Sequence, residues 1–264
     1  MAFVRIAGQL LHYRLAGRVG APVLVLANSL GTDARIWDAV LERLGPDFHI
    51  LSYDKRGHGL SDAPPGEQTL DEHVGDLEGL VAHLGFDRFV LAGVSVGGLI
   101  AQGYALRHPG KLLGLILMDT AARIGSVESW NARIGAVLGN GIASISDQIL
   151  DRWFDETYRR TRPDDFAGWR HMLERTPAAG YAGTCAALRD ADLRADVGRI
   201  ATPALVLAGE KDVSTPPELV RETAGLIPNA RFEMIPRAGH LPNIEQPDAL
   251  VAAFRRYFAE IALG

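Results

Sequence analysis

The sequence predicts an α/β fold, in which a mostly parallel eight-stranded sheet is flanked by helices and carries an inserted helical cap. Short apolar runs alternate with amphipathic stretches through residues 23–118, as in strands and helices wound about a parallel sheet. The alternation stops over residues 121–194 and resumes at residue 204. We therefore predict one α/β core in two parts, residues 1–120 and 195–264, with residues 121–194 as the cap.

The expected strands are short apolar runs bounded by turn residues. Gly8-Gln9 divides two short alternating runs and predicts an opening hairpin. The other strands are expected at residues 23–26, 49–53, 89–92, 112–118, 204–208 and 231–235. Between them, apolar residues recur at helical spacing, and Thr69 with Glu72 forms a capping-box pattern that predicts a helix start.

Composition narrows the function classes. The chain has 264 residues, 27 Lys and Arg against 32 Asp and Glu, and a net charge of −5. This acidic balance argues against binding nucleic acid or an anionic membrane. The single cysteine, Cys185, excludes an internal disulfide and a cysteine-based metal cluster. Neither a signal-peptide pattern nor a membrane-spanning apolar run is visible, so we expect a cytoplasmic protein; nothing indicates an oligomeric state.

The strongest motif is Gly93-Val94-Ser95-Val96-Gly97, which lies between an apolar strand and a helix. A nucleophile elbow requires this context, because its serine sits on a tight strand-to-helix turn. Glycines on both sides let the strained backbone pass, and the Val96 amide at the helix start can stabilise negative charge. Ser95 is therefore the candidate nucleophile; the alternative is a structural serine in a glycine-rich turn.

A serine nucleophile needs a histidine base and a carboxylate that orients the base. His240 follows the last apolar strand, and Asp212 follows the strand at 204–208. In doubly wound folds, functional residues gather at such strand ends. Glu210 is a competing carboxylate, but Asp212 lies at the loop tip and has more freedom to turn toward His240.

A second donor to the oxyanion should come from the loop after the strand at 23–26. That loop reads Ala27-Asn28-Ser29-Leu30-Gly31, and we expect the Leu30 amide to donate. Asn28 and Ser29 are alternatively simple turn formers.

Three segments carry a resemblance to a known family: residues 26–32, 54–61 and 181–193. With the elbow, they resemble the α/β-hydrolases and, among these, the 3-oxoadipate enol-lactonases of aromatic catabolism. The segment at 181–193 is the most lactonase-like. The chain departs from that family at Val96, where methionine is more frequent, and in the weakly matched residues 139–165.

The resemblance implies the α/β-hydrolase fold and hydrolysis of 3-oxoadipate enol-lactone to 3-oxoadipate. It places Ser95, Asp212 and His240 at the triad positions and the amides of Leu30 and Val96 at the oxyanion hole. It implies neither a cofactor nor a metal. The partner is then a small anionic lactone, with no nucleic acid and no membrane.

Other readings remain at this point. The same triad could serve a carboxylesterase, a perhydrolase or a carbon–carbon bond hydrolase of ring-cleavage products. A non-catalytic ligand receptor would not need all three residues. The loop at 54–61 could hold a second catalytic His and Asp, but Gly57 and Gly59 favour a turn in which Asp54 and Arg56 brace neighbouring loops.

The carboxylate of such a lactone requires a cation in the pocket. Residues 121–194 contain ten arginines, no lysine and ten acidic residues, so most of these arginines should sit in solvated ion pairs. Trp130 and Arg133 would lie on one helical face, where an aromatic wall beside a planar guanidinium suits a flat carboxylate-bearing ring. We therefore favour Arg133 with Trp130, and Arg123 and Arg189 are the other candidates.

Overall fold

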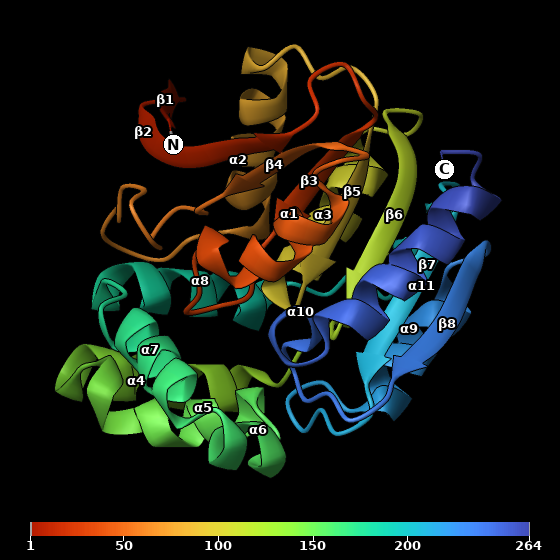
Figure 1. Cartoon of the computed structure of the whole chain (residues 1–264). Coiled ribbons are helices and arrows are strands. Elements are labelled where there is room, and N and C mark those ends of the chain that lie inside the picture. Colours follow the sequence, from red (N-terminus) through yellow and green to blue (C-terminus); the bar gives the residue numbers. More distant parts are fainter. Residues whose placement is uncertain (1, 264) are drawn as a thin grey trace.

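The computed structural model describes residues 2–263 and holds one eight-stranded sheet with the order β1-β2-β4-β3-β5-β6-β7-β8 (Figure 1). β1 and β2 form an antiparallel hairpin, β2 is also antiparallel to β4, and the remaining neighbours are parallel. This confirms the predicted fold class. The strands are β1 (Ala2–Ile6), β2 (Gln9–Gly17), β3 (Val23–Ala27), β4 (His49–Tyr53), β5 (Phe89–Val94), β6 (Leu112–Met118), β7 (Ala204–Gly209) and β8 (Ala230–Ile235).

The central strands are covered on both faces, which explains their continuous apolar sequences. Every residue of β5 and β7 is buried. β5 runs two residues past its predicted end because Val94 still pairs with Met118, and β7 runs one residue further because Gly209 pairs with Ile235. The elbow serine and the loop of Asp212 therefore start at the carboxyl edge of the sheet.

Helices on both faces enclose this sheet. α1 and α11 pack against each other on one face, and α2 and α3 lie behind the other (Figure 1). The predicted capping box is confirmed: the Thr69 side chain accepts from Glu72 N, and Glu72 Oε2 accepts from Thr69 N. These helices are α1 (Asp38–Leu44), α2 (Leu70–His83), α3 (Val96–Arg107), α9 (Pro217–Leu226), α10 (Pro242–Glu245) and α11 (Pro247–Glu260).

Five further helices gather at one end of the sheet, green to teal in Figure 1. They are α4 (Val127–Asn140), α5 (Ser146–Trp153), α6 (Glu156–Thr161), α7 (Pro163–Glu174) and α8 (Ala178–Asp190). α8 packs against α4 and, at Gly180, touches the backbone of Gly57 so closely that a Cβ on either glycine would collide with the other. The chain returns to the core where it left, since Leu193 N donates to Ala122 O at 2.8 Å.

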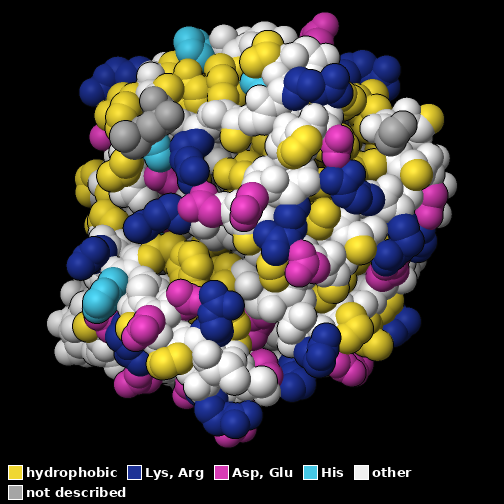
Figure 2. All heavy atoms as spheres, viewed as in Figure 1, with side chains coloured by type: hydrophobic (Ala, Val, Ile, Leu, Met, Phe, Trp, Pro, Cys, Tyr) yellow, Lys and Arg dark blue, Asp and Glu magenta, His cyan; other side chains and the backbone are white. Residues whose placement is uncertain are grey.

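The structure also shows the character of the helices and the distribution of surface charge. Among residues 2–263, no helix combines the length and the apolar character that a membrane crossing needs. Figure 2 shows Lys and Arg side chains next to Asp and Glu side chains over the viewed face. On that face, the charges are interspersed.

Candidate active site

Ser95 stands at a strained turn between β5 and α3. Its φ is +59° and its ψ is −121°, a region that costs a non-glycine residue roughly 1–3 kcal/mol. Hydrogen bonds hold the turn, since Ser95 N donates to Met118 O at 2.9 Å and Ser95 O accepts from Thr120 Oγ1 at 2.7 Å. A Cβ on Gly97 would collide with the Ala27 carbonyl. The motif's glycine therefore lets α3 approach the end of β3.

Asp212 and His240 meet across the ends of β7 and β8. His240 Nδ1 lies 2.8 Å from Asp212 Oδ2, and both side chains are buried. Asp212 Oδ1 accepts from Ser214 N at 2.7 Å, and Oδ2 accepts from Thr215 Oγ1 at 2.6 Å. Burial favours the neutral carboxyl, but the adjoining His240 and these hydrogen bonds hold the Asp212 pKa below its ordinary value. The carboxylate fixes the proton on Nδ1 and leaves Nε2 basic.

The other nearby carboxyls have different partners. Glu210 Oε2 accepts from Arg237 N at 2.9 Å, away from His240. Asp119, at the end of β6, is fully buried and accepts from Gly209 N through Oδ1 at 2.6 Å. Burial, together with the negative charge of Asp212, raises the Asp119 pKa well above its ordinary value. Asp212 is therefore the ionised carboxylate beside His240.

Two backbone amides are free to receive an oxyanion. Within residues 2–263, neither Leu30 N nor Val96 N donates a hydrogen bond, whereas the neighbouring Gly31 N donates to His58 Nε2 at 2.9 Å. Leu30 and Ser95 line one cavity. Asn28 acts within its own loop, because its Nδ2 donates to Thr32 O at 2.9 Å.

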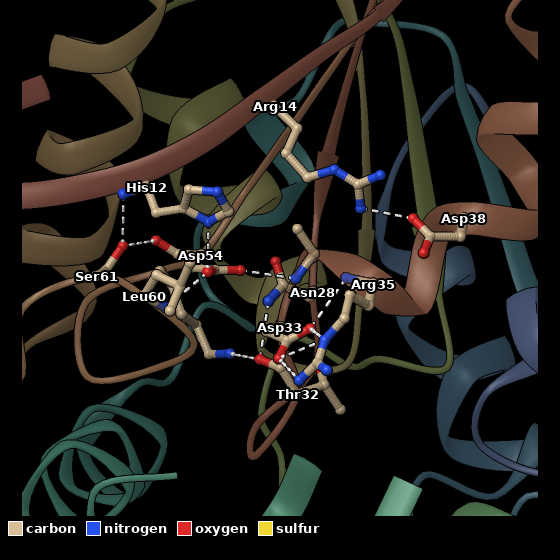
Figure 3. Close-up of polar contacts among 12 residues, drawn as sticks. His12, Arg14, Asn28, Thr32, Asp33, Arg35, Asp38, Asp54, Leu60 and Ser61 are labelled. Carbon is tan, nitrogen blue, oxygen red and sulfur yellow. Dashed lines mark hydrogen bonds and ion pairs between the residues drawn. The ribbon is translucent and has the colours of Figure 1, made fainter. Parts of the chain in front are cut away.

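The loop at residues 54–61 supports the segment at residues 27–34 that contains Leu30. Asp54 accepts from His12 Nδ1 at 2.7 Å and from Ala34 N at 2.7 Å. Figure 3 shows the contact between Asp54 and His12. His58 is fully buried with Nδ1 3.1 Å from Arg56 O. Burial, and then the nearby Lys55 charge, lowers the His58 pKa well below its ordinary value. Neither Asp54 nor His58 lines the cavity of Ser95, so both act as braces.

The cavity beside Ser95 measures about 340 Å³. Ser95, His240 and Leu30 form its core-side wall, and residues of α4, α5 and α8 form the opposite wall. Among the described residues, no hydrogen bond joins Ser95 Oγ to His240; such bonds are often long before a ligand binds. A small molecule in this cavity would contact both side chains.

Trp130 and Arg133 lie together on α4 and line this cavity. The Arg133 guanidinium sits 5.1 Å from the Trp130 ring centroid, and Trp130 Nε1 donates to Ile124 O at 2.6 Å, which holds the ring in place. Arg133 has no carboxylate partner among residues 2–263. Its positive charge is thus available to an anion in the cavity.

The other two arginine candidates lie outside the cavity. Arg123 pairs with Asp192 at 3.2 Å, and Arg189 pairs with Glu67 and Asp190, each at 2.8 Å. Neither is among the residues that line the cavity. The structure therefore brings Trp130 and Arg133 to Ser95 but not Arg123 or Arg189.

Arg152 is a cavity residue that the sequence reasoning did not single out. It lines the cavity together with Gln148 and Trp153, and it has no carboxylate partner within the described chain. Gln148 and Arg152 are one helical turn apart on α5. Trp153 directly follows Arg152 in sequence, so the three-residue spacing that pointed to Trp130 and Arg133 is absent here.

Cys185 belongs to the helix packing. It lies on α8 and is fully buried. Burial raises the pKa of its thiol to about 12, which keeps it un-ionised and a poor nucleophile. Cys185 is therefore a packing residue of α8.

The fold and the site together define the class of protein. A sequence profile of the alpha/beta hydrolase family matches residues 24–253. The chain belongs to this family, and it is a hydrolase.

Particular relatives are more informative than the family. The chain is 33% identical to 3-oxoadipate enol-lactonase 2 of Acinetobacter baylyi over 90% of this chain and 89% of that protein. The crystal structure of the enol-lactonase from Burkholderia xenovorans matches with a TM-score of 0.95 at 37% identity, covering 98% of this chain and 100% of the other. A thermophilic esterase from Thermogutta terrifontis matches with a TM-score of 0.92 at 32% identity, over 99% of both chains.

Proposed function

We propose that this protein hydrolyses the lactone ring of 3-oxoadipate enol-lactone to give 3-oxoadipate, a step of aromatic catabolism. One observation carries the proposal. Arg133, which has no acidic partner among residues 2–263, faces the same small cavity as Ser95 and His240. An anionic ester finds both a nucleophile and a cation there. Relatives named 3-oxoadipate enol-lactonase support the choice of lactone.

The reaction begins with attack of Ser95 Oγ on the lactone carbonyl carbon. His240 Nε2 takes the hydroxyl proton, while Asp212 holds the ring through Nδ1 at 2.8 Å. The carbonyl oxygen becomes an oxyanion and accepts from the free amides of Leu30 and Val96. One such donor typically contributes about 3–4 kcal/mol to the transition state.

The ring opens when the bond between the carbonyl carbon and the ring oxygen breaks. The enol oxygen departs with the proton that His240 Nε2 took from Ser95 Oγ and leaves an acyl group on Ser95. Water then attacks this ester, and His240 Nε2 takes a proton from the water and passes it to Ser95 Oγ as the acyl group leaves. The freed enol tautomerises to the ketone, so the whole reaction consumes one water and needs no redox step.

The substrate carboxylate is assigned to Arg133. A guanidinium donates two parallel hydrogen bonds to a carboxylate, and the Trp130 ring beneath it provides a flat wall for the planar lactone. Arg152, from the neighbouring helix α5, provides a second positive charge on the same cavity.

The test is the decay of enol-lactone absorbance with purified protein, beside an aryl acetate of similar size. A preference of several orders of magnitude in kcat/KM for the enol-lactone is the expected result. Comparable rates on both substrates would instead point to a general carboxylesterase. The match to the Thermogutta terrifontis esterase makes that the second candidate.

A further inference from the structure

Lys55 is a buried amine with an unusual set of partners. It directly follows β4 and Asp54, and only 2% of its surface is exposed. Its Nζ donates to Ser29 O at 2.5 Å and lies 3.4 Å from Thr32 O. Within residues 2–263, no carboxylate lies within ion-pair distance of it. Burying an ammonium on carbonyl oxygens alone is costly.

The loop that Lys55 touches is already held by uncharged contacts. Asn28 Nδ2 donates to Thr32 O at 2.9 Å, as Figure 3 shows, and Thr32 Oγ1 donates to Ser29 O at 2.9 Å. Gly31 N donates to His58 Nε2 at 2.9 Å. Holding the loop therefore does not require a positive charge.

The bond to Ser29 O has a specific chemical consequence. Ser29 C=O and Leu30 N–H are the two ends of one planar peptide group. A charged donor on the carbonyl end draws electron density from the group and makes the N–H a stronger donor, since hydrogen bonds in a chain polarise one another. The Leu30 amide is the free donor described above, and Lys55 itself does not line the cavity.

We propose that the Lys55 ammonium, acting through the Ser29–Leu30 peptide group, strengthens the Leu30 amide as a donor to the oxyanion. Lys55 is then a positioning residue, because it touches no substrate and acts electrostatically through the Leu30 amide. The proposal rests on the serine mechanism proposed above but not on the identity of the ester.

The charge of Lys55 depends on pH. Burial lowers the Lys55 pKa to about 7, although Asp54 and Asp33 act in the opposite direction. His58 and His73 also face it, and burial followed by the Lys55 charge lowers the pKa of both, to about 3 for His73. The assistance to the oxyanion is therefore present below pH 7 and fades above it.

Stability changes in the opposite direction. Because the folded-state pKa lies below the ordinary 10.5, the unfolded chain holds a proton that the folded chain has lost between pH 7 and 10.5. The free energy of unfolding attributable to Lys55 thus rises with pH over this range. If Lys55 had only a structural role, its deprotonation would not lower kcat over the pH range in which it makes the protein more stable.

The experiment compares Lys55→Met and Lys55→Gln with Lys111→Met. Lys111 is an exposed lysine paired with Asp87 at 2.9 Å and is the matched control. kcat and KM are measured from pH 5.5 to 9.5 on whichever of the enol-lactone or aryl acetate is turned over. At pH 6 we expect kcat of both Lys55 variants to fall about 10- to 100-fold with KM nearly unchanged. The wild-type to variant ratio of kcat should shrink above pH 7, and Lys111→Met should match wild type.

A ratio independent of pH, or a rise in KM without loss of kcat, would overturn the proposal. If Lys55→Met does not fold, Lys55→Gln alone decides, because it keeps a donor and removes the charge. Labelling with a fluorophosphonate separates this inference from the proposed function. An active Ser95→Ala enzyme would refute the serine mechanism itself. If Ser95→Ala is inactive and is not labelled while the Lys55 variants are fully active, only the role of Lys55 is refuted.

Discussion

Asp212 uses both carboxylate oxygens at once, which makes its replacement by asparagine informative. The amide cannot accept equally on both sides, so the His240 ring would lose its preferred tautomer. We expect Asp212→Asn to lower kcat by about 10⁴-fold, as in serine proteases, and Ser95→Ala to remove nearly all activity. Glu210→Gln is the control, since Glu210 accepts from Arg237 N instead. Steady-state kinetics that find Glu210→Gln inactive and Asp212→Asn normal would reverse the choice of acid.

Arg133 provides the second prediction at the scale of a residue. Arg133→Met should weaken transition-state binding of the anionic lactone by about 2 kcal/mol and leave a neutral ester unaffected. Arg123→Met is the matched control, because Arg123 pairs with Asp192 outside the cavity. The measurement is kcat/KM on both substrates. A loss confined to Arg152→Met would move the carboxylate contact to α5, and equal losses on both esters would argue for a packing role.

A site residue could be predicted from the sequence when its sequence neighbours mark it, and not when only contacts with distant parts of the chain do. Ser95 has a local signature, because glycines and an apolar strand surround it in sequence. Asp212 and His240 follow predicted strands, so strand ends pointed to both, although the loop-tip argument was also needed to choose Asp212 over Glu210. Lys55 has no such signature: its burial arises only when residues 29–32 fold over it. Arg152 depends likewise on how α5 lies across the cavity.

At the scale of elements, close contact between α3 and β3 sets the distance between the Leu30 and Val96 amides, the two proposed oxyanion donors. Gly97→Ala would place a methyl group against the Ala27 carbonyl. We expect the variant to lose about 1–3 kcal/mol of unfolding free energy and to lose kcat as well, because Val96 N and Leu30 N move apart.

Gly135→Ala serves as the control for that variant. Gly135 is an exposed position within α4 with open space where a Cβ would go. Alanine there should add about 0.5–1 kcal/mol of stability with normal kcat. Urea denaturation and kinetics on both variants provide the comparison, and a fully active Gly97→Ala enzyme would contradict the proposed spacing.

The element boundaries were predictable where pairing and sequence pattern coincide. The capping box located the start of α2, apolar runs located the six strands β3 to β8, and the alternating runs around Gly8-Gln9 located the opening hairpin. The ends of β5 and β7 were predicted short, because Val94 and Gly209 extend them only through pairing with distant strands. Sequence periodicity does not contain that information.

At the scale of the whole molecule, Glu245 should make the free energy of unfolding depend on pH. Its carboxylate accepts from Asp155 N at 2.7 Å and from Gly239 N at 2.6 Å, which joins α10 to the segment before α6 and to the His240 loop. Burial, which outweighs these hydrogen bonds, raises the Glu245 pKa to about 7. Between pH 4.5 and 7 the folded chain keeps a proton that the unfolded chain has released.

The free energy of unfolding should therefore fall by about 3 kcal/mol as pH rises from 4.5 to 7 through this group. Glu245→Gln removes the titrating group, so this part of the slope should vanish even though the variant is less stable overall. Glu210→Gln should keep the slope. Chemical denaturation at several pH values checks this, and an unchanged slope in Glu245→Gln would assign the pH dependence to another group.

The direct pairing of β6 with β7 has a consequence for how such a protein can diversify. Leu115 lies opposite Ala204 and Met118 opposite Leu207. The two strands therefore pair directly, although helices α4 to α8 lie between them in the sequence. Those helices leave and rejoin the sheet at one point, where Leu193 N donates to Ala122 O. Mutation can therefore reshape one wall of the cavity while the strand ends that hold Ser95, His240 and Asp212 are inherited intact. Selectivity and reactivity are then free to evolve at different rates within one gene.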